Sequence, residues 1–564
     1  MTSVVETDVC VIGAGPAGLT FARQWVGSDC RVLVLEGGGY VRDDRADEQA
    51  DSHIDSPHYL SNAMPVGRRR QFGGTANIWS HVTRPDTGRS YARVLAGECI
   101  DFDGRGWQST SGWPIALSDL NPYYDQAAQQ WLGHQLCRDA QYWSRPGTPP
   151  LTLRSGPLHT QVAQYGAADV FTLRYRDELH AADNIDVQVN STVVELEADQ
   201  GRIDRAIVLR SDGSRQQVYA KVFVLAGGGL ENVQTLLHSE LTRPFASGNR
   251  HDNVGRYITD HPEFLLGTIA PTEPDLMERL GLYDLHHVDS QLVSGLLTFD
   301  QGFKRDEELL NVAAVLVPQW AGFGSLAERA IRSLHPMRSG QLPERPLQHL
   351  RTIAAAPRDT AALLHNRLVK RRRLDRDYPA GYVWHRGGWS RPGVDRSQFK
   401  VLEVHVATEQ TPHREHQLTL GPGRDSLSRQ RLRLRLGWSA NDHANLLRSM
   451  EVLAAEIEGS GIGRFHRWVD FTGPTKPVTH GLHHPMGGTR MHEDPKVGVV
   501  DRDCKVHGVP NLYLAGSSVF TTGLGYANPT LTIAALSTRL AEHLQMVVGA
   551  VKTGGSTAYR TRKL

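Results

Sequence analysis

Short, uninterrupted apolar runs recur near both ends of this chain. Residues 8–12, 31–35, 222–226 and 511–515 each carry a block of consecutive apolar side chains that is followed by glycine or glutamate. Runs of this kind, without polar alternation, are typical of strands buried on both faces of a parallel sheet. The pattern therefore predicts four such strands, with a helix at 19–26 shortly after the first of them.

The pattern changes to alternation between residues 185 and 209. The segments Ile185–Val189, Thr192–Leu196 and Arg205–Leu209 alternate between apolar and polar positions, as half-buried strands do. Turn residues separate the later strands at 200–201 and 211–213. We therefore expect a hairpin meander inserted into the parallel sheet.

The length of the chain predicts more than one core. With 564 residues it is too long for a single compact core, so two intertwined domains are expected. The middle of the chain mixes strands expected at 291–299 and 402–408 with polar, Pro-rich and Arg-rich stretches. A helix expected at 530–545 closes the fold. Its apolar residues share one face: Ile533, Leu536, Leu540 and Leu544.

Composition excludes several classes of partner. A net charge of +1 offers no general field for nucleic acid or for acidic substrates. No apolar run approaches the roughly 20 residues of a membrane span, and no signal peptide precedes the first strand. The five cysteines are scattered without metal-ligand or haem spacing, which predicts reduced thiols and a cytoplasmic protein.

A dinucleotide site is expected at the first strand–helix turn. Gly13-x-Gly15-x-x-Gly18 follows the strand at once, with Ala17 inside the turn, and the second strand ends at Glu36. The glycines permit a tight turn, a close approach to pyrophosphate and close helix packing. Glu36 would bind both ribose hydroxyls and repel a 2′-phosphate, which argues against NADP. The fingerprint alone does not separate FAD from NAD.

Two motifs near the end carry candidate chemistry. One is His483-His484-Pro485-Met486-Gly487-Gly488-Thr489, and the other runs from Gly525 to Thr532 through Asn528-Pro529. An imidazole titrates near neutral pH and can serve as base and then as acid. Asn528 before proline could also simply cap a helix. His480, His483, His484 and His492 lack companion ligands at ordinary spacing, so no metal site is expected.

In ordered motifs over almost its whole length, the chain resembles the glucose–methanol–choline (GMC) oxidoreductase family. The motifs are the glycine turn with Glu36; Gly73-Gly74-Thr75 before Trp79; 222–229 with Glu231-Asn232; and the histidine motif followed by Asn511-Leu-Tyr and Asn528-Pro-Thr. The resemblance implies an α/β fold. It would combine a Rossmann-type FAD-binding domain, with an inserted β-meander, and an α+β substrate domain of antiparallel sheet and helices. The expected boundaries are 1–100, 183–261 and 480–564 for the first, and 101–182 and 262–479 for the second.

The resemblance also implies the reaction and its residues. FAD would oxidise a CH–OH group to a carbonyl by hydride transfer to flavin N5, with His484 as base and Asn528 as its partner on the substrate oxygen. Val194, or its neighbour Val193, would hold the adenine edge. The full set of expected cofactor contacts is Gly13, Gly15, Ala17, Gly18, Glu36, Gly73, Gly74, Thr75, Asn77, Val194, Ala226, Gly227, Gly516, Ser517, Asn528, Pro529 and Thr530.

Two departures from the family pattern bear on the cofactor. Relatives with covalent flavin carry histidine at the position of Ile78, so FAD is expected to be non-covalent, although His81 is close in sequence. Gly516 stands where many relatives have aspartate, and Ser517 or a backbone amide would meet the cofactor there.

The substrate class follows from branch resemblance and from a middle region rich in His, Arg and Trp. We expect a small-molecule alcohol, namely a sugar, a cyclitol or a glycosylated natural product, with Trp320, Trp384 and Trp389 as candidates for ring stacking. The electron acceptor, O2 or another acceptor, and the oligomeric state stay open. The alternatives are oxidation of a simple non-sugar alcohol, a flavin-bound GMC-type lyase without net redox change, an NAD-dependent dehydrogenase and a non-catalytic flavin-binding protein.

Overall fold

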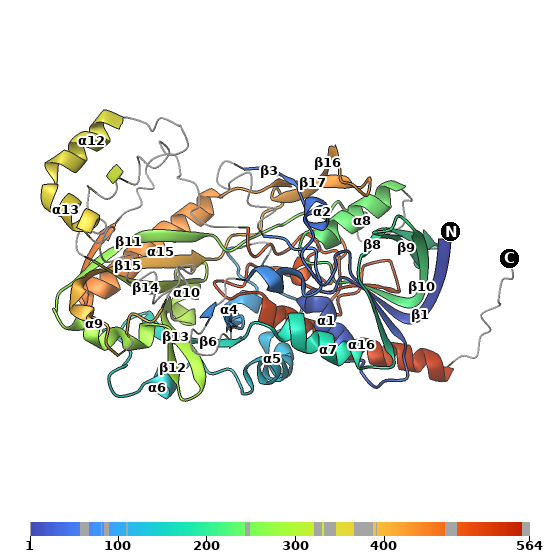
Figure 1. Cartoon of the computed structure of the whole chain (residues 1–564), viewed down its shortest axis with the longest axis horizontal. Helices are drawn as coiled ribbons and strands as arrows, with labels where there is room; N and C mark the ends of the chain where they lie inside the picture. Colours follow the sequence, from blue (N-terminus) through green and yellow to red (C-terminus); the bar gives the residue numbers. More distant parts are fainter. Residues whose placement is uncertain are drawn as a thin grey trace.

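The computed structural model contains two large sheets, which lie at opposite ends of an elongated molecule (Figure 1). A seven-stranded sheet forms one end, and both termini of the described chain lie beside it. A nine-stranded sheet forms the other end. The structure describes residues 2–56, 67–79, 82–83, 90–108, 111–242, 249–320, 327, 330–331, 346–365, 387–390, 392–467 and 482–554.

The seven-stranded sheet combines parallel and antiparallel pairing. Its order is β7-β2-β1-β10-β9-β8, and β19 pairs with β10. The pairs among β7, β2, β1, β10 and β19 are parallel, and those among β10, β9 and β8 are antiparallel. The strands are β1 (Thr2–Ile12), β2 (Val32–Leu35), β7 (Ile185–Gln188), β8 (Ser191–Asp199), β9 (Arg202–Arg210), β10 (Arg215–Leu225) and β19 (Leu512–Leu514).

The predicted meander is present, and β10 joins it to the parallel sheet. The first part of β10 pairs antiparallel with β9, and its last residues pair parallel with β19. The alternating half of this strand and its buried half, 222–225, thus belong to one long strand. The segment at 185–188 differs from the expected meander, because it pairs parallel with β2 and forms the edge of the parallel sheet.

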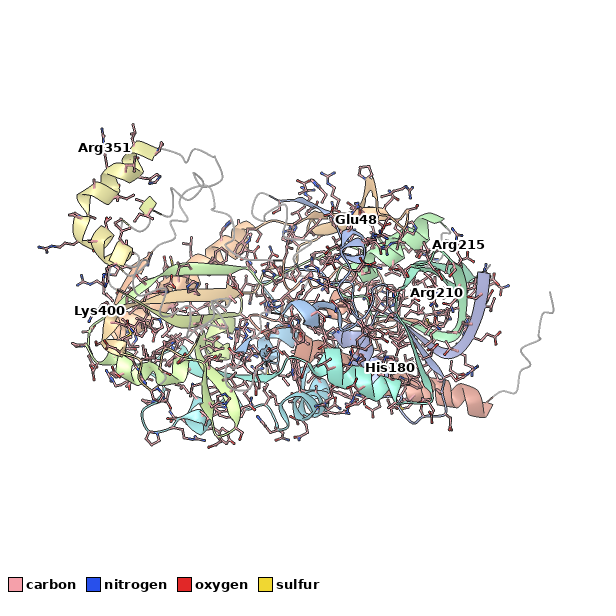
Figure 2. All side chains as sticks on the ribbon, viewed as in Figure 1. Glu48, His180, Arg210, Arg215, Arg351 and Lys400 are labelled. Carbon is pink, nitrogen blue, oxygen red and sulfur yellow. The ribbon has the colours of Figure 1, made fainter. Side chains whose placement is uncertain are left out.

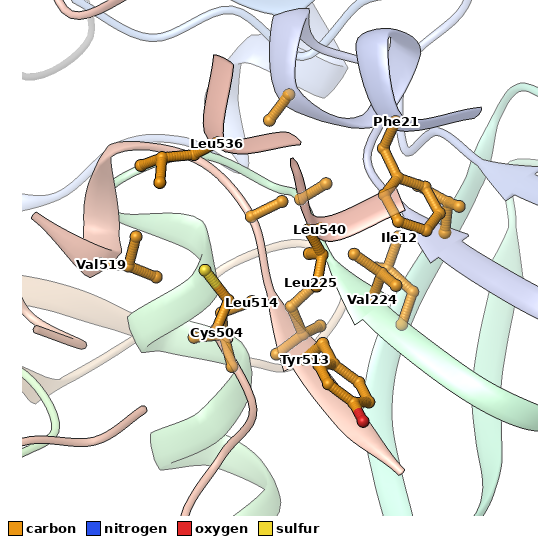
Figure 3. Packing of buried hydrophobic residues seen from close by; sticks show 14 of the residues in the cluster. Ile12, Phe21, Val224, Leu225, Cys504, Tyr513, Leu514, Val519, Leu536 and Leu540 are labelled. Carbon is orange, nitrogen blue, oxygen red and sulfur yellow. The ribbon is translucent and has the colours of Figure 1, made fainter. Parts of the chain in front are cut away.

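Two helices cover one face of this sheet. The first, α1 (Pro16–Arg23), packs against α16 (Thr530–Gly554), which joins the ends of the chain. Figure 3 shows Phe21 of α1 beside Leu540 of α16, over Leu225 of β10. The close packing of α1 depends on Gly18, because a Cβ there would lie 2.0 Å from the Gly13 carbonyl oxygen.

The nine-stranded sheet is antiparallel throughout. Its order is β18-β11-β15-β14-β13-β6-β5-β4, with β12 beside β13. The strands predicted at 291–299 and 402–408 are β13 and most of β15. The bounds are β4 (Val82–Thr83), β5 (Ser90–Val94), β6 (Leu158–Ala167), β11 (Glu263–Pro271), β12 (His286–Val288), β13 (Gln291–Phe299), β14 (Val312–Trp320), β15 (Phe399–Thr408) and β18 (Gly463–Arg467).

A small third sheet and the remaining helices surround these two sheets. The third sheet contains β16 (Gln417–Arg424), β17 (Gln430–Arg435) and β3 (His53–Asp55). The helices are α2 (Asp44–Glu48), α4 (Cys99–Phe102), α5 (Leu117–Leu132), α6 (Ala140–Trp143), α7 (Tyr175–His180), α8 (Glu231–Thr242), α9 (Leu276–Arg279), α10 (Gln301–Asp306), α12 (Pro346–Ala355), α13 (Pro357–His365) and α15 (Ala440–Gly459). Short 3₁₀ or π turns occur at Gly74–Ile78 (η1), Val170–Arg174 (η2), Leu280–Tyr283 (η3), Arg396–Gln398 (η7) and Ser517–Val519 (η8).

The fold class is therefore the predicted one, a parallel α/β sheet with an inserted meander joined to an antiparallel sheet with helices. The side chain of Arg351, on α12, lies on the outline of the molecule (Figure 2). Within the described part of the chain, every helix is too short or too polar to cross a bilayer. The predicted domain boundaries stay a prediction.

Candidate active site

The glycine turn after β1 forms one wall of a cavity of about 390 Å³. Gly13 has a φ of +112°, and a Cβ at this residue would lie 2.6 Å from the Ala226 carbonyl oxygen. The backbone at Gly74 also packs closely against this turn, because a Cβ at Gly74 would lie 2.9 Å from the Gly15 Cα. The three backbone segments thus meet without side chains, and α1 directs its N-terminus toward them. Such a cradle fits the pyrophosphate of a dinucleotide.

Glu36 closes the cradle at the end of β2. Its carboxylate accepts hydrogen bonds from the Ala14 amide at 2.9 Å and from the Gly38 amide at 2.8 Å. Burial raises the pKa of Glu36, and these two hydrogen bonds oppose that rise. The carboxylate lines the cavity opposite Val193 of β8, which suits a ribose and an adenine edge.

An arginine cluster borders the same end of the cavity. Arg68, Arg70 and Arg429 pair with the Glu231 carboxylate at 2.6, 2.7 and 2.6 Å. These guanidinium groups hold the pKa of Glu231 well below its usual range against the effect of burial. Arg70 also donates to Thr192 Oγ1 at 2.9 Å. Arg68 and Arg70 line the cavity, although no motif in the sequence marks them.

His484 and Asn528 meet in the lining of the same cavity. Asn528 Nδ2 lies 3.3 Å from His484 Nε2, although the two residues are 44 positions apart. Asn528 Oδ1 accepts a hydrogen bond from Arg93 Nε at 2.7 Å. Among the described residues, these are the two side-chain hydrogen bonds of Asn528, so its amide faces the cavity and does not cap α16.

The backbone around His484 is held on two sides. The Asp260 carboxylate accepts hydrogen bonds from the amides of Leu482 and His484, the latter at 3.0 Å. Ser517 Oγ donates to the Pro485 carbonyl oxygen at 2.8 Å. A Cβ at Gly229 would lie 2.4 Å from that same oxygen, so the turn after β10 packs directly against the histidine segment.

The surroundings of His484 favour a neutral imidazole. Burial lowers the pKa of His484 well below 6.5, and the neighbouring His261, His483 and Arg93 lower it further. The His261 ring stands edge-on to His484 with centroids 5.2 Å apart. His261 Nε2 bonds to the Gly523 carbonyl oxygen. At neutral pH His484 can therefore accept a proton.

The cavity contains most residues of the expected site. Gly18, Gly73, Asn77 and Val194 stand outside the lining. Gly18 packs α1 on the turn, Asn77 donates to the carbonyl oxygens of Phe72 and Gly74, each at 2.9 Å, and Val193 lines the cavity where Val194 was expected. The expected residues in the lining are Gly13, Gly15, Ala17, Glu36, Gly74, Thr75, Ala226, Gly227, His484, Gly516, Ser517, Asn528, Pro529 and Thr530.

Several lining residues were not found from sequence. Arg93, Trp131 and Glu263 line the cavity, and neither a motif nor local spacing marks them. Trp131 stacks on Trp79 with centroids 5.6 Å apart. By contrast, Trp389 packs in the core of the antiparallel sheet, and Trp384, His81 and His480 lie outside the described residues.

Comparison with known proteins agrees with this geometry. Residues 412–537, which include the histidine segment and Asn528, match the family model described as GMC oxidoreductase. The match covers less than a quarter of the chain, and it is the part that carries His484 and Asn528. This similarity supports an FAD-dependent enzyme of the alcohol-oxidising type.

Other proteins that are similar to this chain include dehydrogenases. The 2-methyl-1,2-propanediol dehydrogenase of Mycolicibacterium austroafricanum is 22% identical over 619 residues, covering 96% of each chain. The fructose dehydrogenase large subunit of Gluconobacter japonicus is 25% identical over 361 residues, which cover 63% of this chain and 52% of the relative. A formate oxidase structure from Aspergillus oryzae matches 97% of this chain and 99% of its own, with a TM-score of 0.52 and 14% identity; this last match concerns the fold.

Proposed function

We propose that this protein is a GMC-type oxidoreductase that oxidises a CH–OH group to a carbonyl, with His484 as the base and Asn528 as its partner on the substrate oxygen. The observation that supports this most directly is that a single cavity is lined both by the glycine cradle and by the His484–Asn528 pair. When bound, FAD supplies the flavin N5 that accepts the hydride.

The hydrogen bonds around His484 support its role as base. Arg93 has no acceptor atom, so the Asn528 oxygen must face it and the Asn528 NH2 must face His484. The NH2 group in turn has no lone pair to offer, so His484 Nε2 must present its own. A substrate hydroxyl that enters here can give its proton to Nε2, while Asn528 donates to the same substrate oxygen. Positioned base catalysis of this kind contributes about 10²–10⁴-fold.

We propose non-covalent FAD. Ile78 lines the cavity at the position where covalently flavinylated relatives carry histidine, and an aliphatic side chain cannot bond to the flavin. The residues present fit the nucleotide: a side-chain-free cradle for the pyrophosphate, Glu36 for the ribose, and the N-terminus of α16 at Thr530 toward the flavin end.

For the substrate we propose a polyhydroxylated compound, such as a sugar, a cyclitol or a glycosylated natural product. The lining of the cavity includes the stacked Trp79 and Trp131 together with polar Arg93 and Glu263. Aromatic faces beside hydrogen-bonding groups suit a ring with hydroxyls. Among the relatives, the name of the fructose dehydrogenase fits this class, whereas the name of the 2-methyl-1,2-propanediol dehydrogenase fits the alternative, a simple non-sugar alcohol. We further propose O2 or another small acceptor as oxidant, and, from five free cysteines, the cytoplasm as location.

The test is anaerobic reduction of the purified flavoprotein, screened over sugars, cyclitols and simple alcohols. We expect one class to bleach the flavin, and His484→Ala to keep its flavin while losing turnover by about a hundredfold or more. His492→Ala is the matched control, because its ring lies outside the cavity lining, and it should turn over normally. Product formed while the flavin stays oxidised would instead establish the lyase, and full activity of His484→Ala would end the assignment of the base.

A further inference from the structure

One cavity residue has no assigned role in the reaction, although it touches Asn528. Arg93 lies in β5 of the antiparallel sheet, opposite Tyr165 of β6, and only 6% of its surface is exposed. Its guanidinium lines the cavity together with His484 and Asn528. A buried arginine is costly unless its charge is used, and here its Nε donates to the Asn528 oxygen at 2.7 Å.

This contact determines which way the Asn528 amide points. The two ends of an asparagine amide have nearly the same shape, so packing alone leaves two orientations open. With the oxygen toward His484, the amide would accept a hydrogen bond and favour a protonated Nε2. With the NH2 toward His484, it donates and requires the lone pair of a base. Arg93, a pure donor, is compatible only with the second arrangement.

We infer that Arg93 is a positioning residue of this active site: by holding the Asn528 oxygen, it turns the Asn528 NH2 toward His484 Nε2 and toward the substrate oxygen. The inference rests on the proposed function, since it presupposes that His484 is the base. It predicts that Arg93 acts on the step in which the hydroxyl proton leaves, and much less on substrate binding.

Arg93 also adds a positive charge near the base. Among the residues that the structure describes, the charged and titratable groups around His484 come from several segments. They are His261, which precedes β11, His483 on its own segment, the Asp260 carboxylate that accepts from its amide, Glu263 in the cavity lining, and Arg93 from β5. Arg93 opposes protonation of His484, as His261 and His483 do. Loss of the guanidinium should therefore raise the pKa at which activity falls on the acid side.

The experiment is a double-mutant cycle on the flavoprotein. Arg93→Met, Asn528→Leu and the double variant are compared by anaerobic stopped-flow flavin reduction across pH, with flavin content and melting temperature as folding controls. We expect Arg93→Met to lower the limiting rate of reduction by about 10–100-fold and to move the acid limb up by about one pH unit, with little change in substrate Kd. In the Asn528→Leu background the same substitution should lower the rate of reduction by less than about threefold, because leucine has no amide group for Arg93 to orient.

Two further variants keep the test decisive. Arg93→Lys retains a donor and the charge, so the acid limb should return near its original position with part of the rate. If Arg93→Met fails to hold flavin, the cycle with Asn528→Leu is run on the lysine variant, for which the same non-additivity is required. Arg154→Gln is the matched control, because Arg154 pairs with Glu456 away from the cavity lining, and its rate and pH profile should not change.

Additive losses, or an unmoved acid limb in Arg93→Met, would overturn the inference. His484→Ala in the same assay separates failure of this inference from failure of the proposed function. If His484→Ala reduces flavin normally, the base is misassigned. If it is inactive while Arg93 and Asn528 act independently, only the positioning role of Arg93 is wrong.

Discussion

Asn528→Asp is the sharpest perturbation of the proposed base. The substitution keeps the shape of the side chain but places a carboxylate oxygen where Nδ2 now lies, 3.3 Å from His484 Nε2. A unit charge pair at that distance is worth about 5 kcal/mol at an effective dielectric constant of about 20, or roughly 3–4 pKa units. Arg93, which stays bonded to the other oxygen at 2.7 Å, offsets part of this. We expect the pKa of His484 to rise by about 1–3 units.

The sign follows from the state of the imidazole. His484 is neutral in the unaltered enzyme down to well below pH 6.5, because burial and nearby cations lower its pKa. In the Asn528→Asp variant the imidazole gains a proton at low pH and no longer acts as a base. The acid limb of flavin reduction should therefore lie about 1–3 pH units higher than in the parent enzyme, and the rate should recover as the pH rises and the proton leaves.

The assay is the rate of anaerobic flavin reduction between pH 5 and pH 10. Asn528→Leu removes the donor without adding charge, so its loss should be similar at every pH. Asn445→Asp, at a buried amide of α15 outside the cavity lining, controls for a new carboxylate elsewhere. Identical pH profiles for the aspartate and leucine variants would refute the reasoning, because the new charge would then have no effect on the pKa of His484.

Three other predictions follow from the structure. Acid precipitation should leave a colourless pellet and free FAD in the supernatant, and a yellow pellet would contradict the non-covalent assignment. Gly229→Ala should lower turnover at least tenfold, because its Cβ would lie 2.4 Å from the Pro485 oxygen and displace the histidine segment; Gly106→Ala, with open space around it, should match the parent enzyme. Burial, with the charges of Glu409 and Glu98, raises the pKa of Asp101 to about 7. Asp101 then binds its proton more tightly when folded, so stability should fall as pH rises from about 4 to 7, and Asp101→Asn should melt about 2 °C or more above the parent at pH 8 but not at pH 5.

The sequence predicted the elements that depend on local pattern. Consecutive apolar residues marked β1, β2, the buried half of β10 and β19, because a strand covered on both faces has no position for a polar side chain. The glycine turn was equally visible. At Gly13 a φ of +112° and a 2.6 Å approach to the Ala226 oxygen leave no room for a side chain. The requirement for glycine is therefore visible in the sequence.

The sequence was less informative about which side chains of a strand point into the cavity. Val194 or its neighbour Val193 was expected at the adenine edge, and of the two it is Val193 that lines the cavity. The β8–β9 ladder shifts register between Val193 and Glu195, so Val194 falls in a bulge. An extra residue in a strand reverses the face on which every later side chain stands, and simple alternation cannot locate it.

Contacts between the two sheets were not predictable from sequence at all. Arg93 and Asn528 are 435 positions apart, and neither Arg93 nor Trp131 belongs to a motif. The tryptophans favoured from sequence lay in the middle of the chain, whereas the pair that lines the cavity, Trp79 and Trp131, comes from the first quarter. Composition indicates that aromatic residues are available, but only the docking of β5 and α5 beside the glycine turn decides which of them reach the cavity.

The loop that carries Asn528 explains why so many charges are buried between the sheets. Tyr526 donates to Glu98 at 2.9 Å, and Thr522 donates to the Asp101 carbonyl oxygen at 2.8 Å. Glu98 is in turn neutralised by Lys304 at 2.7 Å. A buried ion pair adds little stability by itself, but it specifies geometry, because its partners tolerate only one arrangement. Here that arrangement holds the loop before Asn528 against the antiparallel sheet, while Arg93 of the same sheet holds the amide. The position of the amide relative to His484 therefore depends on docking of the two sheets as much as on either motif, and variants that loosen this charged contact should impair catalysis before they release the cofactor.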